Sequence, residues 1–397
     1  MEGSSPATSR PTLAVPKETA ANERRVALVP DVVKRFTSMG LSVLVQAGAG
    51  AGAFISDEAY AQSGATIVPD AATLYQRADI VVKVQKPAPE EISLMRPGTT
   101  LIAFLQPMVN LDLVRQLVQQ RITAFSMDAI PRTTRAQYMD ALSSMATIAG
   151  YKAVLLAADH LPKFFPLLTT AAGTIPPARV LVIGAGVAGL MAIGTARRLG
   201  AVVEAYDARA VVKEQVESLG GKFIEIDIGV DLSGQGGYAR EATEDILRKQ
   251  QEGLAARAAK CDVVISTAAV PGRPAPRLLP ASTVEQMAPG SVIVDLAAET
   301  GGNCELTVPG QIVERNGVTI IGLLNLPSTM PVHASQMYAK NVQNLLALMI
   351  DKSGAFTINM DDDIIANTII TRDGQVLHQG TLQRLSPAPA PAGTPAN

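Results

Sequence analysis

The segment Arg179–Arg209 constrains the fold of this chain more than any other part of the sequence. It begins with an apolar run, Val180–Ile183, which is typical of a buried parallel strand. Three glycines in G-x-G-x-x-G spacing follow and open a helical pattern that ends near Gly200. A second apolar run, Val202–Tyr206, comes next. This order predicts a strand, a helix and a parallel strand, the unit from which doubly wound α/β sheets are built.

The glycines of this segment predict a binding site for a dinucleotide. We expect Gly184 to allow a tight turn, Gly186 to let the backbone approach a pyrophosphate, and Gly189 to let the helix pack closely on the strand. The N-terminus of the helix offers free N–H groups and a positive dipole end to the phosphates. Asp207 follows the second strand, where a carboxylate accepts hydrogen bonds from the ribose hydroxyls.

Two residues near the second strand bear on which dinucleotide binds. The carboxylate of Asp207 repels the 2′-phosphate of NADP and therefore favours NAD(H). Arg209 is the competing signal, because a nearby arginine can accommodate that phosphate. Asp207 stands at the end of the strand itself, so the sequence predicts NAD(H).

Alternating apolar runs and amphipathic stretches predict an α/β fold with two Rossmann-like, doubly wound parallel-sheet domains. Long helices, including Met139–Leu161, are expected to join the domains and leave a cofactor cleft between them. Residues 1–138 with 327–397 form the first predicted domain, and residues 139–326 form the NAD(H)-binding domain. The predicted strands are Leu13–Val15, Ser42–Val45, Ile80–Val84, Leu101–Phe104, Ile122–Phe125, Val180–Ile183, Val202–Tyr206, Lys222–Ile226, Val263–Thr267, Val292–Leu296 and Thr319–Gly322.

Composition excludes several functions. The net charge of −2 gives no basic field for nucleic acid. Two cysteines, Cys261 and Cys304, form no C-x-x-C pair, and the three histidines form no metal motif, so we expect no metal site. No run of about 18 uninterrupted apolar residues occurs, so we expect no bilayer span.

Gly229–Tyr238 contains four glycines (GVDLSGQGGY) and is predicted to be a mobile loop.

A second polar constellation, Pro131–Ser144 (PRTTRAQYMDALSS), follows the last strand of the first domain. Parallel α/β sheets bind ligands at the carboxyl ends of their strands, so a role in binding is one interpretation. A helix beginning near Arg135 would bring several of its polar side chains onto one face. The alternative is that Asp140 and Ser143 only cap and solvate the start of a helix.

Several segments resemble the NAD(H)-binding domain I, or alpha subunit, of proton-translocating nicotinamide nucleotide transhydrogenases. They are Val15–Pro30, Ala78–Pro87, Pro131–Ser144, Thr170–Arg209, Tyr238 after its glycines, and Gly290–Glu305. The resemblance covers roughly Leu13 to Leu382, and PRxxRAQxMDxLSS is its most specific motif. This family is related to alanine dehydrogenase, which has the same two-domain fold.

The resemblance implies a role for each matching residue. The loop residues that hold and orient the nicotinamide, and hence the predicted catalytic residues, are Arg132, Gln137, Asp140 and Ser143. The predicted cofactor-binding residues are Gly184, Gly186, Val187, Ala188, Gly189, Asp207, Ala208, Arg209, Gly237 and Tyr238. Tyr238 would lie at the tip of a loop that closes over the nucleotide. The implied reaction is direct hydride transfer from NADH to NADP+, which needs positioning but no acid, base or thiol.

Differences from the alanine dehydrogenase sequence pattern favour a transhydrogenase over an alanine dehydrogenase. Arg25 and Lys83 align with that enzyme's substrate ligands, but Gln106 stands where it has a catalytic histidine and Glu299 where it has an aspartate. Glutamine cannot act as a general acid or base at neutral pH, so we expect the oxo-acid site to be vestigial. Whether Arg25 and Lys83 retain any role is open at this point.

The resemblance also implies partners, since nothing in this sequence corresponds to an NADP-binding domain or a proton channel. We expect NADP(H) to bind a partner subunit, other partner subunits to be embedded in the membrane, and this chain to form a homodimer. It would then be cytoplasmic and peripherally associated with the inner membrane through its partners. The alternatives are an NAD-dependent alanine dehydrogenase-like enzyme and a non-catalytic NAD-sensing module.

Overall fold

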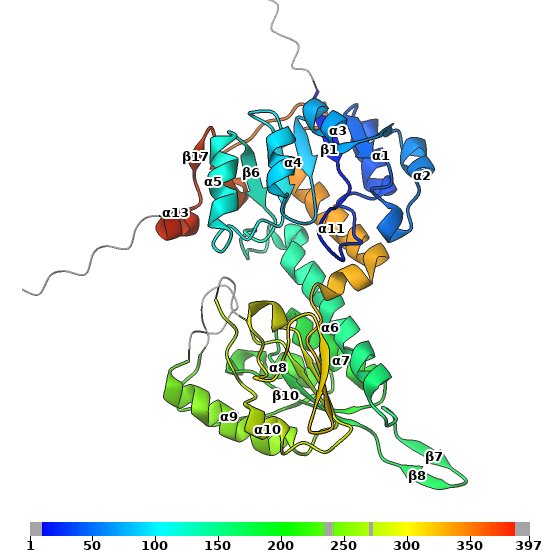
Figure 1. The fold of residues 1–397 in the computed structure, drawn as a ribbon. Helices are drawn as coiled ribbons and strands as arrows, with labels where there is room; N and C mark the ends of the chain where they lie inside the picture. The colour runs from blue at the N-terminus through cyan, green and yellow to red at the C-terminus, as the bar shows by residue number, and fades with distance from the viewer. Residues whose placement is uncertain (1–9, 233, 235–239, 241, 270–272, 386–397) are drawn as a thin grey trace, which may run out of the picture. The chain divides into compact units, whose positions relative to one another are not determined.

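The structure is a computed structural model, which describes residues 10–385 except 233, 235–239, 241 and 270–272. The chain forms two compact units (Figure 1). Unit 1 comprises Met1–Ser144 and Pro331–Asn397, and unit 2 comprises Met145–Met330. A single long helix, α6 (Ala141–His160), runs from the first unit into the second.

Unit 1 is built on an eight-stranded sheet in the order β17-β16-β6-β5-β4-β1-β2-β3. The strands from β3 to β6 are parallel and follow the order 3-2-1-4-5-6, which is that of a doubly wound dinucleotide fold. At the far edge, β16 is antiparallel to β6, and β17 is antiparallel to β16. The strands are β1 (Thr12–Val15), β2 (Ser42–Gln46), β3 (Thr66–Val68), β4 (Ile80–Val82), β5 (Thr100–Ala103), β6 (Thr123–Ser126), β16 (Ile369–Arg372) and β17 (Gln375–Val376).

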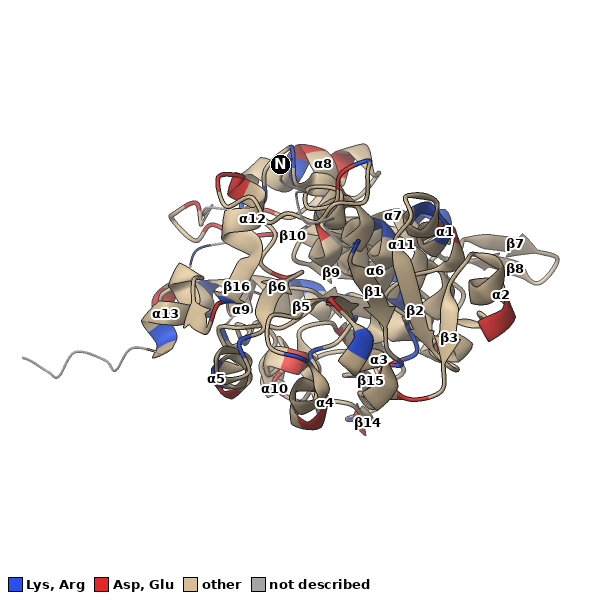
Figure 2. Cartoon of the chain, turned by 90° about the horizontal axis from the view of Figure 1, so that it is seen from above, with Lys and Arg blue, Asp and Glu red and all other residues tan. Residues whose placement is uncertain are grey.

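Amphipathic helices accompany this sheet, as α5 illustrates. Its apolar side chains, including Leu113 and Leu117, are buried, whereas those of Asp112 and Arg115 are 91% and 59% exposed. Figure 2 shows both acidic and basic residues on this helix. The helices of unit 1, besides the start of α6, are α1 (Pro30–Ser38), α2 (Asp57–Gln62), α3 (Ala71–Arg77), α4 (Pro89–Leu94), α5 (Leu111–Gln119), α11 (Pro331–Leu346), α12 (Asp363–Thr368) and α13 (Gln379–Leu385).

Unit 2 repeats the same parallel order in a seven-stranded sheet, β11-β10-β9-β12-β13-β15-β14, with only β14 antiparallel. Its strands are β9 (Arg179–Ile183), β10 (Val202–Tyr206), β11 (Lys222–Phe223), β12 (Val263–Ser266), β13 (Val292–Asp295), β14 (Ile312–Arg315) and β15 (Val318–Ile321). Its helices are α7 (Val187–Arg198), α8 (Lys213–Ser218), α9 (Glu244–Ala258) and α10 (Ala281–Val284). A separate hairpin, β7 (Leu168–Thr170) and β8 (Gly173–Ile175), extends from this unit as a two-stranded arm (Figure 1).

The predicted α/β class and doubly wound sheets are confirmed, but both sheets are mixed at one edge. The apolar pattern did not predict β3, β14, β16, β17 or the hairpin. Each of these strands is only two to four residues long, and all but β16 are largely exposed, so they lack the continuous apolar run by which a buried parallel strand is recognised. Ile369 and Ile370 of β16 are buried, but Thr371 and Arg372 follow them directly. The predicted strand Lys222–Ile226 is paired only over its first two residues.

Helix α6 is the one helix of the described residues that is long and apolar enough to cross a membrane. In this fold it supplies a core face of unit 2, where Ala153, Val154 and Ala157 are fully buried. A Cβ on its Gly150 would lie only 2.1 Å from the carbonyl oxygen of Ala188, so α6 and α7 are in close contact. Its apolar character is therefore explained by packing inside the protein.

Candidate functional site

The glycine turn after β9 has a separate geometric reason for each glycine. Gly184 has φ +93°, and a Cβ there would lie 2.6 Å from Oγ1 of Thr267. A Cβ on Gly189 would lie 1.8 Å from the carbonyl oxygen of Gly184, so only glycine lets α7 approach the turn. A Cβ on Gly186 would meet nothing within 4 Å, so this backbone borders open space. The glycine turn is therefore closely packed at Gly184 and Gly189, and its backbone is accessible at Gly186.

The N-terminus of α7 adjoins this open space. Gly186 is its N-cap residue and provides no side-chain cap, while Val187 is exposed and Ala188 half-buried. Uncapped N–H groups at a helix N-terminus attract phosphate, because they are donors at the positive end of the helix dipole. The residues present therefore suit a pyrophosphate.

Asp207 holds the turn from the neighbouring strand. Its Oδ2 accepts a hydrogen bond of 2.8 Å from the N–H of Ala185. Its carboxylate also receives hydrogen bonds of 2.9 Å and 2.8 Å from the backbone N–H and Nε of Arg209, and one of 2.7 Å from an Nη. This contact raises the pKa of the Arg209 guanidinium. The two residues that gave opposing signals in the sequence form one ion pair, with the half-buried Ala208 between them.

The loops after β12 and β13 complete this edge of the sheet, and sequence reasoning did not assign roles to their residues. Thr267 donates from its hydroxyl to the carbonyl oxygen of Gly184 (3.0 Å). Asn303, fully buried, accepts from the N–H of Ala268 (3.0 Å) and donates to its carbonyl oxygen (2.8 Å). Asp295 binds the hydroxyls of Ser266 and Thr307. The GSVIVDLAAETGGNCE segment was the available signal, because it contains both Asp295 and Asn303.

Gly237 and Tyr238, the predicted closing loop, lie outside the described residues. Their predicted roles stay predictions.

In unit 1, the loop that follows β6 and the first turn of α6 carry the other predicted site residues. Arg132 and Gln137 are exposed, and Asp140 and Ser143 are partly buried. Asp140 accepts from the N–H (2.9 Å) and the hydroxyl (2.6 Å) of Ser143, so it caps α6. Helix α6 therefore begins at Ala141, close to the start of the predicted helix Met139–Leu161 and not near Arg135, so the single polar face that a start near Arg135 would have produced does not form. An Asp in this place starts the helix itself, so the polar residues before it lie in a 3₁₀ turn and not on one helical face.

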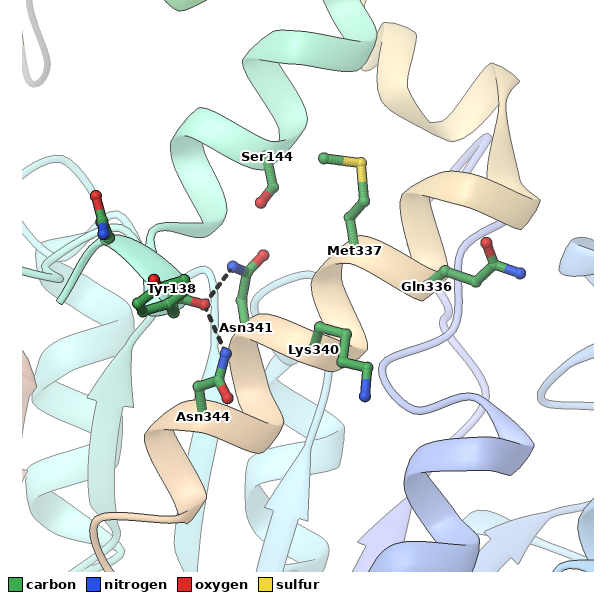
Figure 3. A pocket seen from close by; sticks show the side chains of 8 residues that line it. Tyr138, Ser144, Gln336, Met337, Lys340, Asn341 and Asn344 are labelled. Carbon is green, nitrogen blue, oxygen red and sulfur yellow. Dashed lines mark hydrogen bonds between the residues drawn. The ribbon is translucent and has the colours of Figure 1, made fainter. Parts of the chain in front are cut away.

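Residues far away in the sequence anchor this loop. Asn341 and Asn344 of α11 donate from their side-chain amides to the carbonyl oxygen of Tyr138, at 2.9 Å and 3.0 Å (Figure 3). Arg135 forms ion pairs with Asp362 and Asp363 at the start of α12. The Arg135 guanidinium lowers the pKa of Asp362 to about 2. The loop that carries Gln137 is thus fixed on both sides.

Arg25 and Lys83, which were predicted to align with alanine dehydrogenase substrate ligands, are held by carboxylates of this chain. Lys83 is fully buried, with its Nζ 2.8 Å from Glu91 and 3.5 Å from Glu18. Burial raises the pKa of Glu18, and Lys83 only partly offsets this. In Glu91 the opposing effects of Lys83 and nearby donors exceed that of burial and lower its pKa. Arg25 is likewise buried and paired with Glu23.

Gln106 has a left-handed backbone with φ +47°. The N–H groups of Leu105 and Gln106 both donate to Oδ1 of Asp128, at 3.0 Å and 3.1 Å. The backbone at Gln106 is therefore held in place at the carboxyl end of β5, and its side chain is exposed. The side-chain amide offers hydrogen bonds but no proton transfer at neutral pH.

Two doubly wound units, one with a dinucleotide-type glycine turn, define a class of two-domain nucleotide-binding α/β proteins. Comparisons with known proteins narrow this class. "Alanine dehydrogenase/PNT, N-terminal domain" matches residues 14–149, and "Alanine dehydrogenase/PNT, C-terminal domain" matches residues 153–379. The chain belongs to the alanine dehydrogenase/PNT family.

Within this family the chain is more similar to transhydrogenases. It is 46% identical over 374 residues to an NAD(P) transhydrogenase subunit alpha chain of Rhodospirillum rubrum, covering 92% of this chain and 97% of that protein. Identity to alanine dehydrogenase of Bacillus subtilis is 30% over 390 residues, covering 96% of each. A solved transhydrogenase structure from Sinorhizobium meliloti has a TM-score of 0.81 and 41% identity, covering 93% of this chain and 99% of that one.

Proposed function

We propose that this chain is the NADH-binding component of a proton-translocating transhydrogenase and takes part in direct hydride transfer between NADH and NADP+. The observation that carries the proposal is the 46% identity to a transhydrogenase alpha subunit over nearly the whole of both chains. The glycine turn supports it, because its open face and uncapped helix suit a pyrophosphate.

NADH, when bound, supplies a hydride at C4 of its nicotinamide. The chain's own residues bind, orient and shield the cofactor. Gly186, Val187 and Ala188 would hold the phosphates through backbone N–H groups, and Asp207 would accept from ribose hydroxyls. Gln137, on the anchored loop, would orient the nicotinamide together with the predicted Arg132, Asp140 and Ser143. Such a reaction needs near-attack geometry and no proton transfer, so the lack of an acid or base at Gln106 is no obstacle.

NAD(H) is the preferred nucleotide in this proposal because of the Asp207–Arg209 pair. The Arg209 guanidinium already makes two hydrogen bonds to Asp207 and would have to leave them to bind a 2′-phosphate. The carboxylate would then face that phosphate without compensation. NADP(H) accordingly belongs to a partner subunit.

An alanine dehydrogenase-like activity has weaker support. Besides the lower identity, the cations that would bind an oxo-acid are occupied, Arg25 by Glu23 and Lys83 by Glu91. A non-catalytic NAD-sensing module would share the nucleotide site but would not transfer hydride in any complex.

The proposal includes partners: an NADP-binding subunit, membrane-embedded subunits and a second copy of this chain. The chain would lie on the cytoplasmic side of the inner membrane and be held there by those subunits. The β7–β8 arm supports self-association, since Leu167, just before β7, and Ile175 of β8 are 57% and 39% exposed. Light scattering should give the mass of a dimer, and a stable monomer would contradict self-association.

Nucleotide titration tests the binding proposal directly. NADH and NADPH are titrated into the purified chain by nucleotide fluorescence, which is free of tryptophan emission because the chain contains no Trp. We expect at least about tenfold tighter binding of NADH, since an unpaired buried polar group or a repulsion costs ~1–3 kcal/mol. Equal affinities for NADH and NADPH would contradict the proposal that Asp207 selects NADH. Pyruvate and ammonia with NADH should give no alanine, and typical dehydrogenase rates would favour the alternative enzyme.

A further inference from the structure

A polar hollow lies on unit 1, and all the residues that line it belong to that unit (Figure 3). Its volume is about 520 Å³, within the range of small-molecule sites. It is lined by Gln137, Tyr138, Ser144, Gln336, Met337, Lys340, Asn341 and Asn344. We propose that this hollow binds an anionic mononucleotide whose base carries an exocyclic N–H group, such as an amino or carboxamide group.

A buried acceptor in the hollow lacks a donor. Asn341 is 5% exposed, and its Oδ1 has no hydrogen-bond partner among the described residues. The amide cannot simply be flipped, because its Nδ2 donates to the carbonyl oxygen of Tyr138. In Figure 3 the oxygen points toward the space between Ser144 and Met337. A buried acceptor without a donor costs ~1–3 kcal/mol, so a ligand N–H is favoured at this point.

The walls of the hollow suit a flat heteroaromatic base. Tyr138 is 68% exposed and offers a ring, and Met337 on α11 offers a polarisable thioether. Both groups make favourable contacts with the face or edge of such a base. The positions 336, 337, 340, 341 and 344 have helical spacing, so one face of α11 forms a continuous wall.

The charge of the hollow favours an anion. Lys340 lies on its wall, and its Nζ makes a hydrogen bond of 3.1 Å to Gln343. None of the eight lining residues is acidic, so the hollow carries one uncompensated positive charge of its own. A phosphate would be attracted to Lys340 while the base donates to Asn341. Gln137 lines the hollow and also belongs to the loop that the proposed function assigns to the nicotinamide, so the proposal rests on the proposed function in one respect: bound NADH leaves the hollow open.

Calorimetry on the full chain saturated with NADH tests this site, because NADH then occupies the glycine turn. The probes are AMP and NMN, which carry the required N–H, and IMP, which replaces the amino group of AMP by a carbonyl. We expect one AMP or NMN site per chain and at least about tenfold weaker binding of IMP. Comparing AMP with NMN identifies which base the walls prefer.

Two matched variants locate the site. Asn341→Leu and Asn344→Leu each remove one hydrogen bond to Tyr138, but only Asn341→Leu removes the unpartnered acceptor. Asn341→Leu should weaken AMP binding about tenfold, and Asn344→Leu should weaken it much less. Lys340→Gln should weaken AMP but not adenosine. If Asn341→Leu does not fold, the AMP and IMP comparison on the unaltered chain decides.

The proposal is overturned if neither AMP nor NMN binds the NADH-saturated chain, or if AMP and IMP bind equally. It is also overturned if Asn341→Leu and Asn344→Leu have the same effect on binding.

Discussion

Substitution of single glycines in and near the turn after β9 separates binding from folding. Gly186→Ala adds a methyl group that meets no protein atom within 4 Å, at φ −76°, which alanine adopts readily. Reduced freedom of the unfolded chain stabilises by ~0.4–1 kcal/mol. Alanine is a poorer N-cap than glycine by a similar ~0.5–1 kcal/mol. The free energy of unfolding should therefore change by less than ~0.5 kcal/mol.

NADH binding by Gly186→Ala, unlike its free energy of unfolding, should change strongly. The added methyl group of Gly186→Ala occupies the open space where the proposal puts the pyrophosphate, so NADH affinity should fall by well over tenfold, or more than ~1.4 kcal/mol. Gly189→Ala differs, because its Cβ would lie 1.8 Å from the Gly184 carbonyl oxygen. The backbone must move, which costs ~1–3 kcal/mol or more and also distorts the turn.

Gly194→Ala is the matched control on the same helix. Its Cβ would lie 3.5 Å from an Nη of Arg198, an ordinary contact, and alanine stabilises a helix interior by ~0.5–1 kcal/mol. NADH titration and urea unfolding followed by circular dichroism measure all three variants. Wild-type NADH affinity in Gly186→Ala would refute the placement of the phosphates. Equal stability of Gly189→Ala and Gly194→Ala would refute the close packing of α7 on the turn.

Two further predictions concern the anchored loop of unit 1. The amides of Asn341 and Asn344 share one acceptor, the carbonyl oxygen of Tyr138. The double variant Asn341→Ala/Asn344→Ala should therefore slow hydride transfer in the reconstituted complex by more than the product of the single effects, with NADH affinity changed less than about twofold. Additive effects on ΔG‡ would contradict joint anchoring of the loop by the two amides. The depressed pKa of Asp362, about 2 against the ordinary 3.8, means that the Arg135 ion pair stabilises fully above pH 3.8 and loses this contribution as pH falls through about 2. The difference in thermal midpoint between the unaltered chain and Arg135→Gln should shrink over that window, and a pH-independent difference would show that the pair is not its cause.

What the sequence could predict is what is encoded locally. Strands such as Val263–Ser266 are buried throughout and therefore read as uninterrupted apolar runs. The glycine turn was predictable because spacing along a single strand and helix sets its geometry. The tasks expected of Gly184 and Gly189 have matching steric causes in the structure.

What the sequence could not predict depends on distant residues. Asn341 and Asp362 reach the loop of unit 1 from positions more than 200 residues away, and no local pattern marks them. The pairing of Asp207 with Arg209 was not evident either, since adjacency does not show whether an acid and a base bind each other or a ligand. The antiparallel edge strand β16 joins the first sheet only because the chain returns there after unit 2.

Stopped-flow hydride transfer tests the central claim most directly. The chain is mixed with NADH and an NADP+ analogue, first alone and then with a separately purified NADP-binding transhydrogenase component. We expect no transfer by the chain alone and rapid transfer in the complex, where both nicotinamides reach about 3–3.5 Å between reacting atoms. Gln137→Asn or Arg132→Ala should slow it by ~10²-fold, while NADH affinity falls much less. Transfer by the chain alone, no transfer in the complex, or unchanged rates in both variants would contradict the account.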